Sequence, residues 1–286
     1  SGGTPFGIPS FYTISWTGPN GFTSTSTSLT DLVPGTYTLS VEDANSCVHM
    51  EEYIIEAPSE VVITTDNTSN VICFAASDGE ISITPSGGTG NYTFAWTKDG
   101  APFATSEDLT NLDPGNYEVT LTDSNGCFTI ASYIITEPPA LNLTVDTVVN
   151  VLCFGDSTGD IAISVSGGTG AFTYSWTKDG IAYAITEDLS IITAGTYEVT
   201  VTDASGCTII EEITVTETPE IIVDYTKTDI TCSGDNNGTI VLNLTGGVAP
   251  YTHTWSDLGT GLTRNNLAAG NYTITVIDAL CCTVAE

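Results

Sequence analysis

The chain has 286 residues, with 4 Lys plus Arg against 35 Asp plus Glu, so its formal charge at pH 7 is −31. Such a charge repels nucleic acid and anionic lipid, which excludes both as partners. With 14% charged and 41% hydrophobic residues and no run of 18 apolar residues, the composition predicts a folded chain without membrane insertion.

A period of about 80 residues organises the chain, and such a period is the mark of a repeat architecture. A Gly-Gly pair, a tryptophan and a corner ending in tyrosine recur in this order. The tryptophans are Trp16, Trp96, Trp176 and Trp255, and the tyrosines are Tyr37, Tyr117, Tyr197 and Tyr272. Links containing Pro58, Pro138 and Pro219 separate the copies, because proline interrupts a strand.

These links divide the chain into four repeats: repeat 1 (1–58), repeat 2 (59–138), repeat 3 (139–219) and repeat 4 (220–286). The segment between Gly3 and Trp16 is five residues longer than the corresponding segment of the other copies. We expect repeat 1 to lack its start and repeat 4 its end. A parent protein with more copies is therefore expected.

Apolar residues alternate with polar ones along each repeat, which indicates half-buried β-strands. In repeat 2 the alternation covers residues 81–84, 92–97 and 117–122. Asp99-Gly100 and Asn125-Gly126 supply residues that suit tight hairpin turns. A buried Trp on a central strand and a tyrosine corner are typical of immunoglobulin-like sandwiches. The predicted fold is all-β, with tandem immunoglobulin-like sandwich repeats of about 80 residues.

Six of the eight cysteines follow the period. If the chain after Cys73 runs extended to Gly79, Cys73 lies level with Cys127 on an adjacent strand. We therefore favour disulfides within each repeat, namely Cys73–Cys127, Cys153–Cys207 and Cys232–Cys282. The alternative joins Cys47 to Cys73 and Cys127 to Cys153 across the junctions. Disulfides at this density predict a location outside the cytosol.

The sequence offers little for catalysis, which needs a nucleophile beside an oriented base. His49 and His253 are the two histidines, and neither follows the period. The S-x-x-K match at residues 175–178 is absent from the equivalent stretch of repeat 2. We predict that the chain is not an enzyme, has no catalytic residues and requires no cofactor.

Acidic residues that recur near the repeat ends allow two interpretations. One is a modest Ca²⁺ site at each junction, made by Glu56 with Asp123, Glu137 with Asp203, and Glu217 with Asp278, because Ca²⁺ prefers oxygen ligands. The other, which we favour, is that each Asp caps its own turn through backbone N–H groups.

The combined pattern resembles the SprB-type repeat of large surface adhesins of gliding Bacteroidetes. It is carried in repeat 2 by Cys73, Asp78-Gly79, the S-G-G-T-G stretch 86–90, Trp96, Gly115-Asn116-Tyr117, Asp123 and Gly126-Cys127. The last part of the pattern also looks like polycystin-type sandwich domains. The resemblance implies a long, repetitive cell-surface protein exported by type IX secretion, which acts as an adhesin in attachment or gliding motility.

The resemblance also implies chemistry and partners. Two short stretches look like the O-glycan acceptor of Bacteroidetes secreted proteins, which predicts sugar on Thr147 or Ser157. The implied partners are a surface polysaccharide or an abiotic surface, reached through the parent protein, and other repeats of the same chain.

The predicted function is therefore a non-catalytic, disulfide-stapled stalk of a secreted adhesin. One alternative is a carbohydrate-binding array of a polysaccharide-degrading enzyme, with Phe22, Phe103 and Tyr183 stacking on sugar rings. Another is a subunit of a homo-oligomeric extracellular filament, because edge strands can serve either a stalk or a filament.

Overall fold

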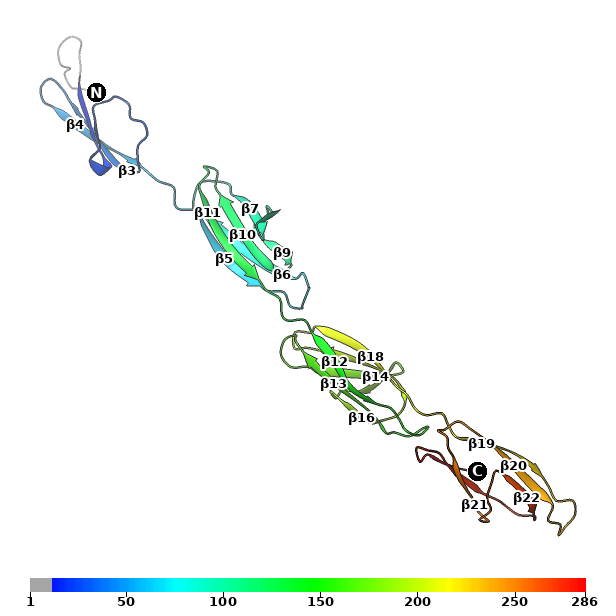
Figure 1. Cartoon of the computed structure of the whole chain (residues 1–286). Helices are drawn as coiled ribbons and strands as arrows, with labels where there is room; N and C mark the ends of the chain where they lie inside the picture. Colours follow the sequence, from blue (N-terminus) through cyan, green and yellow to red (C-terminus); the bar gives the residue numbers. More distant parts are fainter. Residues whose placement is uncertain (1–11) are drawn as a thin grey trace. The chain divides into compact units, whose positions relative to one another are not determined.

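The structure is a computed structural model that describes residues 12–286. Apart from one short 3₁₀ turn, η1 (Pro19–Gly21), the regular structure of these residues consists of β-strands (Figure 1). The residues described contain no helix that is long and apolar enough to cross a membrane. The predicted all-β fold of tandem immunoglobulin-like sandwiches is confirmed.

Repeat 3 shows the complete sandwich, which has a three-stranded and a four-stranded sheet. The first sheet is ordered β12 (Asn142–Val149), β13 (Gly159–Ser166) and β16 (Leu189–Ile192). The second is ordered β15 (Ile181–Ala184), β14 (Thr173–Lys178), β17 (Gly195–Thr202) and β18 (Thr208–Val215). Both sheets contribute to one core, in which Ile161, Trp176 and Val199 are buried.

Repeat 2 has the same strand order in both sheets. Its first sheet contains β5 (Val62–Ser69), β6 (Gly79–Ser86) and β9 (Leu109–Leu112). Its second contains β11 (Phe128–Ile135), β10 (Gly115–Thr122), β7 (Thr93–Lys98) and β8 (Ala101–Ala104). The alternation predicted for this repeat is confirmed, because Ile81, Ile83, Val119 and Leu121 are all buried.

Repeats 1 and 4 show fewer strands. Repeat 4 contains β19 (Ile222–Thr228), β20 (Gly238–Thr245) and β22 (Thr263–Leu267) in one sheet, and β21 (Thr252–Trp255), β23 (Ile274–Ile277) and β24 (Thr283–Ala285) in the other. The described part of repeat 1 forms one sheet, ordered β2 (Thr23–Ser24), β1 (Thr13–Thr17), β3 (Gly35–Glu42) and β4 (Val48–Ile55). Gly2, Gly3 and the insertion after them lie outside the described residues.

The chain packs into two compact units whose boundaries fall inside repeat 2. One unit comprises the described residues up to Thr68 with 80–110 and 115–134, and the other comprises 69–79, 111–114 and 135–286. The loop that carries Cys73 therefore belongs to the same unit as repeat 3. We keep the term repeat for the four sequence units.

Local sequence explains the turns and the corner of repeat 3. Asp179 and Gly180 both have positive φ, 50° and 79°, in the tight turn between β14 and β15, as their residue types favour. The hydroxyl of Tyr197 donates a hydrogen bond of 2.7 Å to the carbonyl of Thr193. Trp176 Nε1 donates one of 2.9 Å to the carbonyl of Thr186. The predicted tyrosine corner and buried tryptophan are confirmed.

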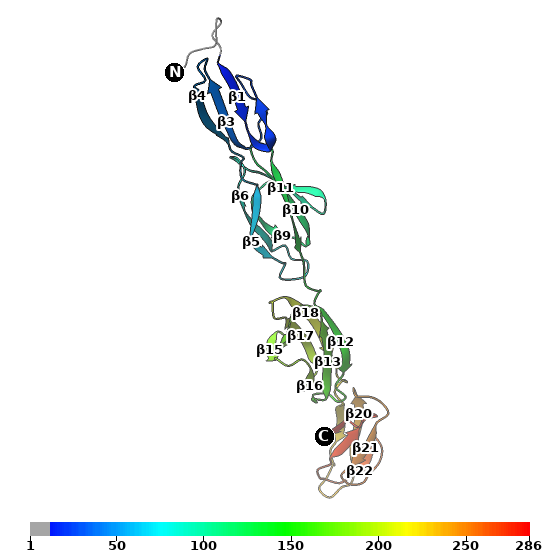
Figure 2. The ribbon, with the colours of Figure 1, turned by 90° about the vertical axis from the view of Figure 1, so that its left-hand side faces the viewer.

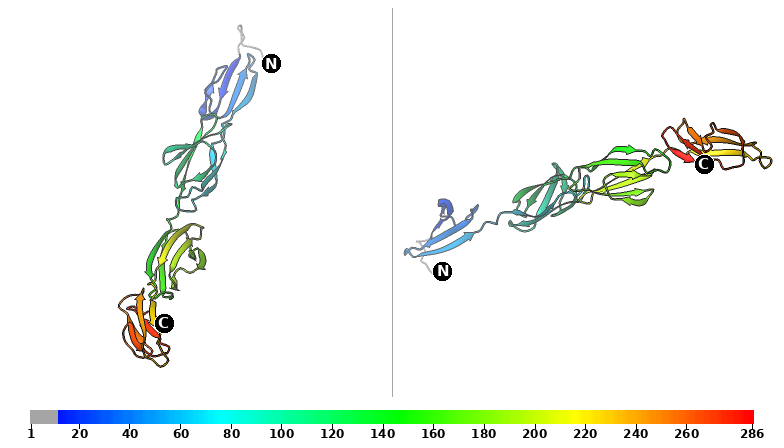
Figure 3. Two further views of the ribbon diagram at one scale, coloured as in Figure 1. Left: turned by 90° about the vertical axis from the view of Figure 1, so that its right-hand side faces the viewer. Right: turned by 90° about the horizontal axis from the view of Figure 1, so that it is seen from below.

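The first and last strands of repeat 3 run in the same direction, side by side (Figures 1 and 2). A parallel bridge joins Val151 to Glu217 just beyond the ends of β12 and β18. There the N–H of Val151 donates to the carbonyl of Thr216 at 2.9 Å. In both views of Figure 3 the strands of this repeat, drawn in green to yellow, follow roughly one direction. Residues before β18 and residues after β12 therefore lie at opposite ends of the sandwich.

Candidate functional site at the cystine-linked repeat junctions

Two disulfides join consecutive repeats. Cys73 of repeat 2 is bonded to Cys207 of repeat 3, and Cys153 of repeat 3 to Cys282 of repeat 4. Their Cα atoms are 5.7 and 5.4 Å apart, which is the ordinary range for a disulfide. Each bond links the loop after the first strand of one repeat to the residue that precedes the last strand of the next.

The predicted pairing within repeats is therefore wrong, as is the alternative set across junctions. The rejected pairs are Cys73–Cys127, Cys153–Cys207, Cys232–Cys282, Cys47–Cys73 and Cys127–Cys153. The reason is the parallel alignment of first and last strands, which puts Cys153 and Cys207 at opposite ends of repeat 3. An eight-residue strand such as β18 spans about 27 Å, far beyond the reach of a disulfide.

The loop that presents Cys153 is shaped by its neighbours. Asp156 N–H donates to the carbonyl of Cys153 at 3.1 Å, and Gly155 has a φ of 76°. The Glu217 carboxylate accepts a hydrogen bond of 2.7 Å from the N–H of Gly155. In repeat 2 the Glu137 carboxylate accepts one of the same length from Ala75. The recurrent glutamates thus cap the cysteine loops of their own repeats.

The partner cysteine is presented by a turn built on a buried carboxylate. Asp203 is 4% exposed, and its Oδ1 accepts hydrogen bonds from Ser205 N–H and Cys207 N–H, both at 2.9 Å. Its Oδ2 accepts from Thr169 N–H at 2.8 Å. Burial alone would raise the pKa of Asp203, but hydrogen bonds from four backbone N–H groups outweigh it and hold that pKa below its usual value.

The same turn occurs in every repeat. Asp43, Asp123 and Asp278 are also buried, and each accepts a hydrogen bond from the N–H of the cysteine four residues later. The interpretation that each Asp caps its own turn is confirmed.

This use of the carboxylates does not fit the predicted calcium sites. Glu137 and Glu217 accept backbone hydrogen bonds within their loops, as Asp123, Asp203 and Asp278 do within their turns, while Glu56 is exposed. Across residues 12–286, no group of three or more His, Cys, Asp or Glu is placed to hold a metal ion. Calcium stays a prediction of the sequence alone.

A cleft of about 240 Å³ lies beside the Cys73–Cys207 bond. Phe74, Pro138, Leu141 and Ile209 give it an apolar lining, and Asp203 lies at its wall. Phe74 remains 53% exposed. The junction therefore combines a covalent bond with an apolar contact that is only partly closed.

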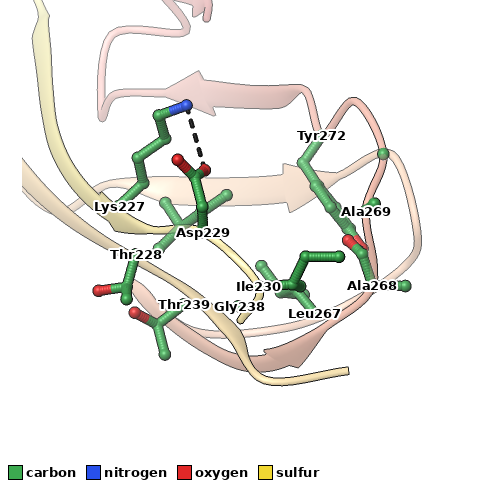
Figure 4. A pocket seen from close by; sticks show the side chains of 12 residues that line it. Lys227, Thr228, Asp229, Ile230, Gly238, Thr239, Leu267, Ala268, Ala269 and Tyr272 are labelled. Carbon is green, nitrogen blue, oxygen red and sulfur yellow. Dashed lines mark hydrogen bonds and ion pairs between the residues drawn. The ribbon is translucent and has the colours of Figure 1, made fainter. Parts of the chain in front are cut away.

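A second cleft, in repeat 4, is lined by Lys227, Ile230, Leu267 and Tyr272 among others (Figure 4). Its one drawn ion pair, between Lys227 and Asp229 at 3.4 Å, is largely exposed. In repeat 3 the corresponding space is filled by the last strand, where a Cβ on Gly159 would meet Val215 at 3.1 Å. We therefore regard this cleft as the unfilled place of core side chains rather than as a ligand site.

The aromatic residues considered for sugar stacking are half-packed. Phe103 and Tyr183 are 47% and 46% exposed, and each lies edge to face against a buried tyrosine, Tyr117 or Tyr197. Phe22 packs in the same way on Tyr37. Part of each ring thus faces solvent at the same place in three repeats.

The predicted glycan acceptors are both at the surface. Thr147 is exposed in β12, at a break in the register with β13, and Ser157 is exposed in the loop after Cys153. Their modification stays a prediction.

Comparison with known proteins agrees with the repeat pattern. The family model described as "SprB repeat" matches residues 65–101, 145–180 and 225–260. The chain contains SprB repeats. Each matched segment includes the loop cysteine of its repeat, namely Cys73, Cys153 or Cys232.

Other similarities are local or distant. The decoration protein of Escherichia phage T5 is 47% identical over 51 residues, which are 15% of this chain and 31% of that protein. The chain thus spans about a third of this curated relative. Three N-terminal domains of the bacteriophage RB49 Hoc protein match with a TM-score of 0.40 and 16% identity over 78% of this chain and 91% of theirs. Sidekick-1 immunoglobulin domains 1–5 match with a TM-score of 0.32 and 13% identity over 96% of this chain and 73% of theirs.

Proposed function

We propose that this chain is a non-catalytic stalk segment of a secreted cell-surface adhesin, and that its task is to carry tension between its two ends. The observation that carries this proposal is the pair of disulfides between consecutive repeats. The SprB repeats and the sandwich fold support it. Disulfides of this kind persist outside the cytosol, which supports an extracellular location.

The disulfides create two covalent routes through repeat 3. One route enters along the peptide link 136–141, follows β12 to Cys153 and leaves through the bond to Cys282. The other enters from Cys73 at Cys207, follows β18 and leaves along the peptide link 216–221. Both routes consist mainly of one strand that is already extended. Residues 154–206 are attached to these routes but lie on neither.

This connectivity limits how far repeat 3 can lengthen under force. Without the disulfides, unfolding would release the whole repeat, and roughly 80 residues at 3.3–3.6 Å each would add about 250 Å beyond the folded length. With both disulfides, only two short extended segments bear force, and the gain is on the order of 10 Å. Repeat 3 would therefore keep its length even if it lost its fold.

Single-molecule force spectroscopy of the oxidised and reduced chain tests this proposal. We expect a step of about 250 Å for repeat 3 only after reduction. Either disulfide alone leaves one short route through repeat 3, so the step should return in the oxidised chain only when both bonds are removed, as in the double variant Cys153→Ser with Cys207→Ser. Cys281→Ser, which alters an unpaired cysteine, should not restore it. A full-length step for repeat 3 in the oxidised wild-type chain would contradict the proposal.

Within this proposal, the adhesin is exported by type IX secretion and acts in attachment or gliding motility on a polysaccharide or abiotic surface. Adhesion of the purified chain to such surfaces, compared with a whole-cell assay of the parent protein, tests this part. Cells that attach and glide normally after deletion of the repeats would contradict it.

Carbohydrate binding is a second candidate function, favoured by the half-exposed rings of Phe103 and Tyr183. Stacking on a sugar needs one open aromatic face. A polysaccharide pull-down that Phe103→Ala and Tyr183→Ala together abolish, while Ile185→Ala at a position 81% exposed does not, would support it. Unchanged binding in the double variant would exclude these rings.

A further inference from the structure

Three unpaired cysteines occupy the same places as the paired ones. Cys127 and Cys47 take the place of Cys207, directly after the final turn, and Cys232 takes the place of Cys73 and Cys153 in the loop after the first strand. All three are free and exposed. A position that is bonded in one repeat is thus open in another.

The turn cysteines are already held in the bonded geometry. Cys207 N–H donates to Asp203 Oδ1 at 2.9 Å, and Asp203 N–H donates to the Cys207 carbonyl at 2.9 Å. The same two hydrogen bonds join Cys127 to Asp123 at 2.8 and 2.9 Å. Cys47 and Asp43 form them at 2.8 and 3.0 Å. The unpaired turns therefore need no rearrangement to present their thiols.

The loop of Cys232 is likewise formed without a partner. Asp235 N–H donates to the Cys232 carbonyl at 3.0 Å, as Asp156 does to Cys153 at 3.1 Å. Gly234 has a φ of 94°, where Gly155 has 76°. The carboxylate of Asp235 accepts the N–H of Cys232 at 3.0 Å. The carboxylate of Asp235, which belongs to the loop itself, therefore caps this loop as the carboxylate of Glu217 caps the loop of Cys153 in repeat 3.

The pairing rule leaves these cysteines without partners among residues 1–286. A loop cysteine bonds the turn cysteine of the following repeat, 134 or 129 residues later in the sequence. For Cys232 that spacing points to a position after residue 286, and for Cys127 and Cys47 it points to positions before residue 1. Pairing Cys232 with Cys127 would join the loop of a later repeat to the turn of an earlier one, against the observed order.

We infer that Cys232, Cys127 and Cys47 are covalent attachment sites for further repeats of the same kind. Cys232 accepts a turn cysteine that lies four residues after a buried Asp, as Cys207 and Cys282 do, whereas Cys127 and Cys47 each accept a loop cysteine. In each reaction two thiols lose two protons and two electrons and form one disulfide, while a disulfide oxidant such as oxidised glutathione is reduced to two thiols. Cys281 is outside this scheme, because it occupies the place of a turn glycine.

An extended chain tests the inference. Residues 1–282 are followed by a second copy of residues 208–286, which keeps the register because Cys282 takes the place of Cys207. After refolding with oxidised and reduced glutathione, non-reducing peptide mapping should join Cys232 to the appended copy of Cys282. Cys232 should then lose its reactivity toward an alkylating reagent. In the Cys232→Ser variant the appended cysteine should stay reactive.

The unextended chain shows whether a second copy can supply the partner. At high protein concentration in the same buffer, head-to-tail bonding of Cys232 with Cys47 or Cys127 of another copy gives a ladder on non-reducing gels. Loss of the ladder in Cys232→Ser but not in Cys281→Ser supports a second copy as the source. No ladder, together with pairing in the extended chain, assigns the partner to the same polypeptide.

The Cys73–Cys207 bond is the internal control, since its recovery shows that oxidation and folding succeeded. If this bond forms while Cys232 stays reactive in both the extended and the unextended chain, the inference is wrong. Bonding of Cys232 to Cys281 would also overturn it.

Discussion

Cys73 and Cys207 are separated by 134 residues and belong to consecutive repeats, yet their Cα atoms lie 5.7 Å apart in a disulfide. Cys153 and Cys282 repeat this relationship one repeat later. Repeat 3 is therefore bonded to the following repeat through its loop cysteine and to the preceding repeat through its turn cysteine. The bonds run beside peptide links only a few residues long, so each of these two junctions has two covalent connections.

Replacing Cys207 should open one junction selectively. In Cys207→Ser, Cys73 becomes a free thiol and the melting temperature falls, because the disulfide no longer limits the denatured chain. In the chain-entropy model a closed loop of this length contributes about 5 kcal/mol when all of it unfolds. Thiol titration and a thermal melt measure both effects. Cys127→Ser is the matched control and should leave both disulfides intact; recovery of a Cys73–Cys127 peptide from the wild-type chain would contradict the assignment.

Acid should weaken repeat 3 through Asp203. Its pKa in the folded state is below its usual value, which is about 3.9 in an unfolded chain. The stabilisation is therefore fully present above the unfolded pKa and is lost as pH falls through the lower folded pKa. Asp203→Asn should melt at a lower temperature at neutral pH and show a weaker loss on acidification. Parallel melting curves for variant and wild type from neutral to acid pH would contradict this role.

Substitution of two glycines distinguishes the cost of backbone strain from the cost of steric contact. Gly168 and Gly206 both have positive φ, 59° and 87°, so an added Cβ costs about 1–2 kcal/mol at either position. At Gly168 the Cβ would also lie 2.5 Å from Leu141 Cδ1 and 2.8 Å from Asp203 Oδ2, whereas at Gly206 nothing lies within 4 Å. Gly168→Ala should lower the free energy of unfolding by a further 1–3 kcal/mol or so. Denaturant titration measures both variants, and equal losses would show that the contact is relieved at no cost.

The local features of the fold could be predicted from the sequence because each depends on neighbouring residues. The alternation around Ile81 predicts its burial, and Asp179-Gly180 predicts a tight turn. The tyrosine corner at Tyr197 follows from the recurrent place of this tyrosine two residues after the corner glycine, Gly195. The buried Asp203 was also recognisable, since an Asp just before a turn commonly caps it.

The cysteine pairing could not be predicted, because it depends on a relationship between strands far apart in the sequence. Pairing within a repeat and pairing with the next repeat both obey the same period, so spacing alone does not distinguish them. What decides is the parallel contact of β12 with β18, made by Val151 and Thr216. A prediction that placed Cys153 at the end of β12 and Cys207 at the start of β18 would have separated them. The loop-capping role of Glu217 was missed for the same reason.

The last prediction concerns Glu217, whose carboxylate accepts the N–H of Gly155 beside Cys153. Glu217→Ala should lower the free energy of unfolding by about 1 kcal/mol, the typical net contribution of such a hydrogen bond. It should also speed reduction of the Cys153–Cys282 bond, because the loop then opens more readily. Glu217→Gln keeps an acceptor oxygen and should retain most of the stability, while Glu212→Ala, at an exposed position of β18, should change neither property.

The same variants test calcium against loop capping. If the carboxylate serves the loop, the wild-type melting temperature stays the same with added Ca²⁺ or with EDTA, because Oε2 of Glu217 already accepts a backbone N–H and the described residues bring no group of three or more possible metal ligands together. A rise with Ca²⁺ that Glu217→Gln abolishes and Glu212→Ala preserves would make Glu217 a calcium ligand. The expectation that Ca²⁺ has no effect would then be wrong, and the second carboxylate oxygen would serve the ion while Oε2 keeps its hydrogen bond from Gly155.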